Sequence, residues 1–271
     1  MSPADLRQRL RAGERLFGTL IVSPSPRWPE VVRGCGLDFV FIDTEHIALD
    51  RAELSWMCQT YAALGLPPLV RIPSPDPDAA TMALDGGAAG VVAPYVESVE
   101  QVQALRGAVK CRPLKGGKLR QVLAGGRVEP ALEQYMADGA AARVLLINVE
   151  SAPALAALDR LLAVPGLDGV LIGPHDLSCS LGLPEQYDHP DFLAACGDIF
   201  RRARAAGVGA GIHFWGDLAQ QRRFLELGAS FLIHSADISL FQKHLRADLT
   251  ALRQDAGAVG AAASPPSGVT I

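Results

Sequence analysis

The chain lacks the features that would point to a membrane or a nucleic acid. None of its apolar runs approaches the roughly 18 residues that a spanning helix needs. A formal net charge of −4 without a basic cluster argues against a nucleic-acid groove. The first residues are polar and lack the apolar core of a secretory signal. We therefore expect a cytoplasmic protein whose partner is a small molecule.

Cysteine is also scarce and irregularly placed. The five cysteines are odd in number and form no CxxC pair, and the chain contains no HExxH motif: Cys35, Cys58, Cys111, Cys179 and Cys196. Neither a disulfide framework nor a zinc knuckle is supported by such spacing. We expect free thiols.

Short apolar runs that alternate with helical patterns are what the sequence does contain. Eight runs resemble strands: 17–22, 38–43, 68–72, 90–93, 143–149, 169–172, 209–213 and 230–234. Helical patterns are expected at 3–12, 29–35, 51–64, 78–84, 99–109, 152–162, 190–206, 218–227 and 238–252. Such alternation is typical of parallel βαβ units, and eight of them predict a single-domain (β/α)8 TIM barrel over residues 1–255 with an extra N-terminal helix. An open doubly wound sheet is the alternative, but the first strand leads into Ser23-Pro24-Ser25-Pro26 rather than a glycine-rich phosphate turn.

Two segments fall outside this repeat. Residues 110–120 form a basic, glycine-containing insertion, and a helical stretch follows to about Asp138. We expect this insertion at the catalytic face or packed beneath it, since long loops of barrels are often functional. Residues 256–271 are mostly small residues and proline, which predicts a disordered tail.

Polar side chains stand where several predicted strands end. An apolar run at 39–42 stops at Asp43, Glu45 and His46, and another stops at Arg71. The carboxyl ends of barrel strands meet at one face, where active sites lie. Solvated charges in ordinary loops, an Asp43–Arg71 salt bridge and a buried core histidine at position 46 are the structural alternatives. Imidazole titrates near neutrality, which makes His46 the acid–base candidate, and a guanidinium at a strand end suits a carboxylate or an enolate.

Glu150 and Asp176 follow the fifth and sixth predicted strands. Two carboxylates without cysteine nearby suit Mg²⁺ or Mn²⁺, with other positions left for water and substrate. The alternative is that both acids pair with surface lysines or arginines. After Pro174, the backbone N–H groups of His175 and Asp176 open a helical turn that suits an anion, unless Asp176 itself caps that turn.

Five motifs together resemble the HpcH/HpaI family of metal-dependent (class II) pyruvate aldolases. They are Phe41-Ile42-Asp43-Thr44-Glu45-His46, Leu69-Val70-Arg71-Ile72-Pro73, the 84–94 segment that begins Leu84-Asp85-Gly86-Gly87, Val149-Glu150-Ser151, and the 172–182 segment that begins Ile172-Gly173-Pro174-His175-Asp176. The resemblance runs from about residue 14 to 250 and implies a lyase that reversibly cleaves a 4-hydroxy-2-oxo acid to pyruvate, or a close 2-oxo acid, and an aldehyde.

The same resemblance implies roles for individual residues. Glu150 and Asp176 would hold the divalent cation, with Co²⁺ or Zn²⁺ also compatible, while Arg71 would contact the enolate oxygen. His46 would move the proton and Asp85 would partner it. The substrate would lie against Asn148, Gly173, Pro174, His175 and Asp176. A homo-oligomer, such as a hexamer built as a trimer of dimers, is expected.

Three departures from the family pattern concern the acceptor side: His175 replaces a small residue, Asn148 replaces glutamine, and the 112–117 loop differs. Other functions are therefore compatible with the sequence. They are an oxaloacetate decarboxylase, an acyl-CoA ester lyase and a barrel that binds metal without activity. A CoA enzyme would need an extended nucleotide site, and an inactive barrel would be expected to have lost at least one of the acids or Arg71.

Overall fold

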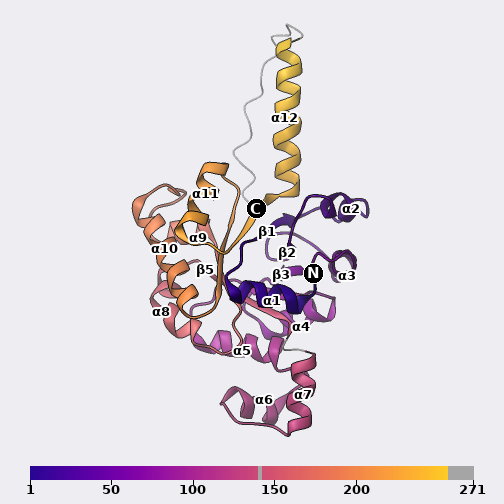
Figure 1. Ribbon diagram of the computed structural model, residues 1–271, viewed down its shortest axis with the longest axis vertical. Coiled ribbons are helices and arrows are strands. Elements are labelled where there is room, and N and C mark those ends of the chain that lie inside the picture. Colours follow the sequence, from indigo (N-terminus) through magenta and orange to yellow (C-terminus); the bar gives the residue numbers. More distant parts are fainter. Residues whose placement is uncertain (140–141, 256–271) are drawn as a thin grey trace.

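Eight parallel strands close into a barrel in the computed structural model, which describes residues 1–139 and 142–255 (Figure 1). The strands are β1 (Leu16–Ile21), β2 (Phe39–Asp43), β3 (Pro68–Arg71), β4 (Gly90–Ala93), β5 (Val144–Val149), β6 (Gly169–Ile172), β7 (Gly209–Phe214) and β8 (Phe231–Ala236). Each strand pairs with the next in the chain, and β8 pairs with β1. The predicted (β/α)8 barrel is confirmed and the open sheet is excluded. The tail predicted to be disordered, 256–271, lies outside the described residues.

The helices are α1 (Pro3–Ala12), α2 (Trp28–Arg33), α3 (Arg51–Ala63), α4 (Pro77–Asp85), α5 (Val99–Lys110), α6 (Gly116–Leu123), α7 (Pro130–Asp138), α8 (Ala152–Leu162), α9 (Pro174–Ser180), α10 (Pro190–Ala205), α11 (Leu218–Leu227) and α12 (Asp237–Asp255). Most of the helices follow a strand and surround the barrel, whereas α1 precedes the first strand, and α6, α7 and α12 project from the body (Figure 1). Capping boxes start several of them, such as that of Asp50 and Glu53 in α3. None of the helices in the described ranges is long and apolar enough to cross a membrane.

Side chains of the strands divide between two cores. Leu16, Leu20, Phe39 and Phe41 point into the barrel, where Leu6 and Leu10 of α1 pack against them at the N-terminal end. A Cβ at Gly18 would lie 2.5 Å from the Phe39 ring, so this position must remain glycine. The alternate side chains of the strands face the helices. The interior of the barrel is thus filled by side chains.

The 110–120 insertion does not reach the catalytic face. It follows α5, and a connection from a helix to the next strand of a barrel lies at the N-terminal end. Its helices α6 and α7 project from the body at the end remote from α12 (Figure 1), and neither has a buried residue. Lys118 of the insertion lies 2.8 Å from Glu129 in this arm. The expectation of a functional loop over the site is therefore corrected.

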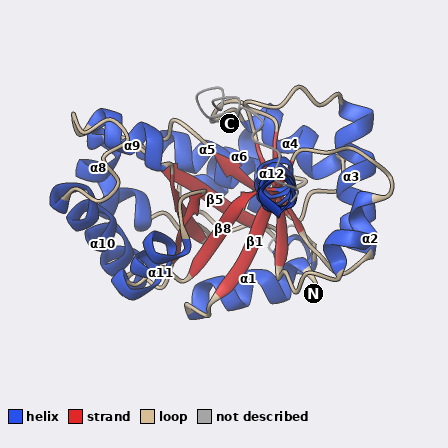
Figure 2. Ribbon diagram, turned by 90° about the horizontal axis from the view of Figure 1, so that it is seen from above, coloured by secondary structure: helices blue, strands red, loops and turns tan. Residues whose placement is uncertain are grey.

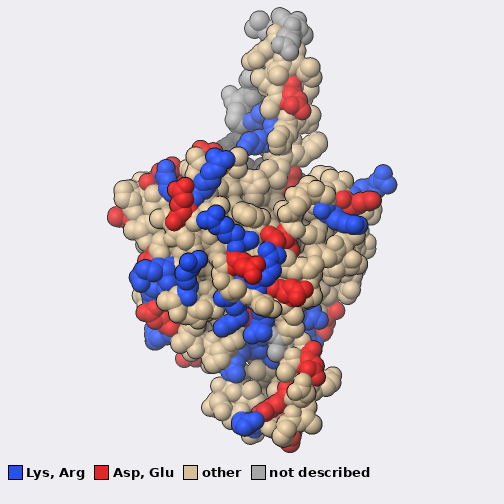
Figure 3. Space-filling view, in the orientation of Figure 1, with Lys and Arg blue, Asp and Glu red and all other residues tan. Residues whose placement is uncertain are grey.

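The last helix does not cover its own barrel. Helix α12 projects away from the barrel in Figure 1 and is seen end-on in Figure 2. Phe241, Leu245, Leu249 and Leu252 recur at helical spacing, form one stripe, and are between 40% and 63% exposed. On the face in Figure 3, positive and negative side chains intermingle over the barrel.

Candidate active site

A cavity of about 700 Å³ opens at the carboxyl ends of the strands. It brings together most of the predicted site residues, namely His46, Arg71, Asn148, Gly173, Pro174, His175 and Asp176. Val22, Ile47, Leu171, Ile172, His213, Trp215 and Ile238 complete its lining. Residues from seven of the eight strand ends converge here because parallel strands of a barrel all finish at this face.

Arg71 is fixed by Asp43 at the floor of the cavity. Its Nε and Nη2 donate to the two Asp43 oxygens at 2.8 and 2.6 Å, so the expected salt bridge is present. Burial alone would raise the pKa of Asp43, but this bidentate guanidinium outweighs it and leaves the pKa below its usual value. Nη1 has no hydrogen bond among the described residues and remains available to a ligand. The ion pair therefore positions Arg71 without using all its donors.

Glu150 and Asp176 converge on the space beside Gly173. A Cβ at Gly173 would lie 2.7 Å from Oε2 of Glu150 and 3.7 Å from Oδ2 of Asp176. Glu150 accepts from the Tyr95 backbone N–H at 2.6 Å and from the Asn148 amide at 2.8 Å. Burial raises the pKa of Glu150, and the negative charges of Asp176 and Glu45 add to this effect.

This arrangement fits a divalent cation. Glu150 has no cationic partner among the described residues, and Asp176 has only His175, at 3.7 Å, so the alternative in which both pair with lysine or arginine is excluded there. No three His, Cys, Asp or Glu side chains in the described ranges form a metal cluster. A cation would take two carboxylate ligands and fill its shell with water and substrate oxygens. Two buried oxygens nearby, Oδ1 of Asn148 and Oε2 of Glu45, have no hydrogen-bond donor among the described residues. They add to the negative potential of this region.

His46 stands at the mouth of the cavity, after β2. Its imidazole is 46% exposed, so it is not a core histidine, and Nε2 lies 3.7 Å from Oε1 of Glu45. Glu45 is buried, and its other oxygen lies 3.1 Å from Arg71 Nε, whose hydrogen is directed at Asp43. One face of the imidazole is therefore free to meet a ligand.

The start of α9 faces the cavity without a side-chain cap. Gly173 is the N-cap residue, so Asp176 is not the cap, and its carboxylate is left for other partners. His175 lines the cavity and lies 3.7 Å from Asp176 and 3.9 Å from Glu185. The first N–H groups of this turn remain available to an anion.

Three further residues at the site were given no role by the sequence analysis. Tyr95 adopts φ 55°, a conformation uncommon for an aromatic residue, and thereby directs its N–H at Glu150; a hydrogen bond with Glu45 raises the pKa of its hydroxyl to about 12. Burial, followed by the charge of Arg71, lowers the pKa of His213 to about 4. Trp215 lines the cavity beside it. Only the position of His213 at a strand end could have drawn attention to any of them.

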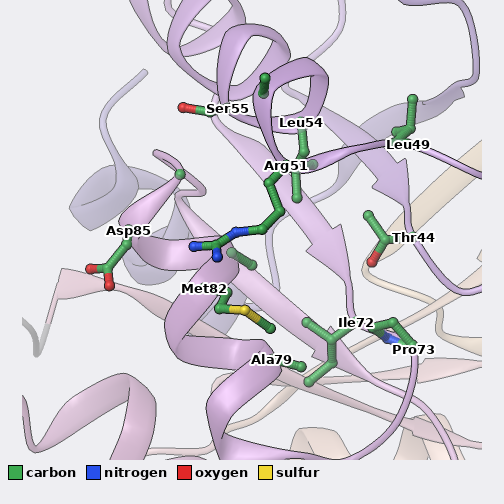
Figure 4. A pocket seen from close by; sticks show the side chains of 13 residues that line it. Thr44, Leu49, Arg51, Leu54, Ser55, Ile72, Pro73, Ala79, Met82 and Asp85 are labelled. Carbon is green, nitrogen blue, oxygen red and sulfur yellow. The ribbon is translucent and has the colours of Figure 1, made fainter.

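Asp85 does not lie with the other predicted residues. It ends α4, the helix that leads into β4, and so lies near the N-terminal end of the barrel, where it pairs with Arg112. A separate cavity of about 630 Å³ runs between α3 and α4; Figure 4 shows Arg51 extending across it and Asp85 at its edge. One chain therefore does not bring Asp85 to His46, because the two residues lie at opposite ends of the barrel.

A closed (β/α)8 barrel with a cavity at the carboxyl ends of its strands, lined by Arg71, His46 and Asp176, is the architecture of a barrel enzyme. The chain belongs to the HpcH/HpaI aldolase/citrate lyase family, whose sequence profile matches residues 18–243. It is 34% identical to a hydroxypyruvate/pyruvate aldolase of Pseudomonas aeruginosa over 240 residues, which is 89% of each chain. It is 33% identical to a 2-keto-3-deoxy-L-rhamnonate aldolase of Klebsiella pneumoniae over 253 residues, covering 92% of this chain and 93% of that one.

A solved structure gives the same result. The HpcH/HpaI aldolase of Desulfitobacterium hafniense superposes with a TM-score of 0.79 at 27% identity, covering 92% of this chain and 96% of that one. The named relatives are aldolases, and the likeness over most of the chain supports a lyase. Class II aldolases of this family depend in general on a divalent cation.

Proposed function

We propose that this protein is a class II aldolase that reversibly cleaves a 4-hydroxy-2-oxo acid to pyruvate, or a close 2-oxo acid, and an aldehyde. The observation that carries the proposal is the convergence of Glu150 and Asp176 beside Gly173, next to Arg71. Two acids beside one guanidinium can hold a cation and an oxyanion at neighbouring positions.

The proposed roles follow from the contacts. When bound by Glu150 and Asp176, a divalent cation supplies a Lewis acid for the 2-oxo group. Arg71, oriented by Asp43, directs Nη1 at the same oxygen and stabilises the negative charge that develops there. The N–H groups of His175 and Asp176 would bind the substrate carboxylate, and Asn148 orients Glu150.

His46 is the proposed base for cleavage. It takes the proton of the C4 hydroxyl, the C4–O electrons form the aldehyde carbonyl, and the electron pair of the C3–C4 bond passes into the 2-oxo group as an enolate. The exposed face of its imidazole permits this approach. Decarboxylation of oxaloacetate at the same site would yield the enolate without that proton transfer.

A second copy of the chain is part of this proposal. The apolar stripe of α12, at Phe241, Leu245, Leu249 and Leu252, has no cover among residues 1–139 and 142–255. The outward-facing Phe17 of β1 is itself 39% exposed. A second copy that exchanges α12 would cover both surfaces and give the homo-oligomer expected for this family. Asp85 can partner His46 only across such an assembly.

Mg²⁺ or Mn²⁺ is the proposed cation, because both ligands are hard carboxylates; Co²⁺ and Zn²⁺ remain the other candidates. A cytoplasmic location is also proposed. All five cysteines are free, which suits a reducing compartment.

The test is aldol formation from pyruvate and a panel of aldehydes, with chelated protein and with protein resupplied with Mn²⁺ or Mg²⁺. We expect product only with added metal, and none above background with Glu150→Gln. Full activity of the chelated protein would contradict the proposal.

A further inference from the structure

The cavity has two unlike walls. Arg71, Asn148 and Asp176 stand at the ends of β3, β5 and β6. The apolar Val22, Ile47, Trp215 and Ile238 follow β1, β2, β7 and β8, which are adjacent strands on the other side of the closed barrel. Pyruvate would fill the polar side under the proposed function. The apolar residues are then left for the other product, the aldehyde.

Trp215 is the largest of these apolar side chains and is held firmly. Its ring stacks on Phe214 with centroids 6.0 Å apart and an interplanar angle of 20°. Tyr187 and His213 contact it edge-on, at 6.3 and 5.7 Å. Even so, 37% of Trp215 is exposed. An indole fixed on one side and open on the other offers a preorganised apolar surface to a ligand.

Charge also distinguishes this part of the cavity. Arg71 is the only lysine or arginine that lines it within the described residues, and Asp43 already holds it. His213 is neutral, since burial lowers its pKa to about 4. His175 lies 3.7 Å from the Asp176 carboxylate and 3.9 Å from that of Glu185. A positive charge on His175 would therefore pair with these two acids rather than with a ligand. A second carboxylate on the aldehyde would lose its hydration without gaining a cation from the side chains of this chain that line the cavity.

We propose that the acceptor is an uncharged aldehyde with an apolar side chain, and that Trp215 is the residue that selects it. This inference rests on the proposed function and adds the class of aldehyde. In the synthetic direction, C3 of pyruvate bonds to the aldehyde carbon, and the resulting alkoxide takes a proton from His46. The side chain of the aldehyde is meanwhile buried against the indole. Burial of a side chain of this size corresponds to roughly 10- to 100-fold in kcat/KM.

The experiment compares two aldehydes that differ only at the far end. Butanal and succinic semialdehyde have the same chain length, with a methyl group in one and a carboxylate in the other. We expect kcat/KM with pyruvate and Mn²⁺ to be at least about 10-fold higher for butanal. Trp215→Ala should reduce this ratio to near unity, Trp215→Phe should retain most of it, and Tyr135→Ala, on the remote helix α7, should leave it unchanged.

Exchange of the pyruvate methyl protons with deuterated water is measured in parallel, because it needs no aldehyde. Each aldol rate is divided by the exchange rate of the same variant, which removes general losses of activity. Wild-type exchange combined with a preference for succinic semialdehyde, or for glyceraldehyde over butanal, would overturn this inference alone. Absence of exchange in the wild type would overturn the proposed function and this inference with it. A butanal preference that persists in Trp215→Ala would show that Trp215 is not the selecting residue.

Discussion

Each end of the barrel contains a buried acid, but the two acids differ in the charge of their hydrogen-bond partners. At the N-terminal end, Asp168 is fully buried and accepts from Arg7 at 2.9 Å, from the Lys110 ammonium and from the Leu145 N–H at 3.0 Å. At the other end, Glu150 accepts, among the described residues, only from the neutral N–H groups of Tyr95 and Asn148. The first acid is neutralised by protein cations and ties α1 to the strands. The second keeps uncompensated negative charge, which is expensive unless a cation binds there.

The largest expected effect comes from removing an acid at the catalytic end. Glu150→Gln or Asp176→Asn should lower kcat/KM by roughly 10³ or more, because a bound cation contributes several kcal/mol to the transition state. Stability without metal should not fall for Glu150→Gln, since the change relieves repulsion with Asp176 and the free Oδ1 of Asn148 can accept from the new amide. Steady-state kinetics and urea unfolding in chelator measure the two effects. A large loss of stability in Glu150→Gln would show that Glu150, like Asp168, stabilises the fold.

His46→Ala distinguishes two reactions at the catalytic end, aldol cleavage and the decarboxylation of oxaloacetate. Aldol cleavage should fall by about 10²–10⁴, the range for a lost general base. Metal-dependent decarboxylation of oxaloacetate should change much less, because no hydroxyl proton has to be removed. Borohydride treatment with pyruvate should label no lysine. Equal losses in both reactions would assign His46 a role other than that of base.

Asp85 provides the corresponding test across chains. If it partners His46 of a second copy, Asp85→Asn and His46→Ala proteins should each be weakly active, and a refolded mixture should recover activity at sites built from one intact half of each. A mixed oligomer that recovers no activity would show that Asp85 is not part of the active site.

At the N-terminal end the expected loss is in stability. Asp168→Asn should reduce the free energy of unfolding by about 3–5 kcal/mol, because Lys110 stays buried without its counter-ion. Asp159→Asn is the matched control: Asp159 is an exposed acid paired with Arg202 and should give no measurable loss. Equal stabilities of the two variants would show that the Asp168 cluster is not the tie proposed here.

The smallest expected effect concerns His213. Its pKa is about 4 in the folded protein against 6.5 for the free side chain, so between these values the unfolded chain binds a proton that the native one does not. Stability should therefore fall as pH drops from 6.5 to 4, by about 3 kcal/mol from this residue. His213→Gln should flatten that slope in urea unfolding, whereas the exposed His244→Gln should not. An unchanged slope would contradict the neutral, buried state of His213.

Sequence patterns were sufficient for the barrel because its strands are buried on both faces. The 90–93 and 169–172 runs match β4 and β6 to the residue. At position 18 the Phe39 ring leaves no room for a Cβ, so glycine is required there. Residues at strand ends such as Arg71 and Asp176 were found for the same reason, since all parallel strands end at one face.

Other features depend on contacts that no local pattern records. The period of α12 reveals an apolar face but not what covers it. A non-glycine residue such as Tyr95 gives no sign of a positive φ. Asp85 was placed by resemblance, whereas its position before β4 sends it to the other end of the barrel.

Glu150 and Asp176 at the catalytic end are proposed to bind a divalent cation, whereas Asp168 at the N-terminal end is already paired with Arg7 and Lys110. Titration of metal-free protein with Mn²⁺, followed by calorimetry or by the electron paramagnetic resonance of free Mn²⁺, tests this difference directly. We predict one Mn²⁺ per chain in the wild type and in Asp168→Asn, and none in Glu150→Gln or Asp176→Asn. Equal Mn²⁺ binding by Glu150→Gln and the wild type would contradict the account.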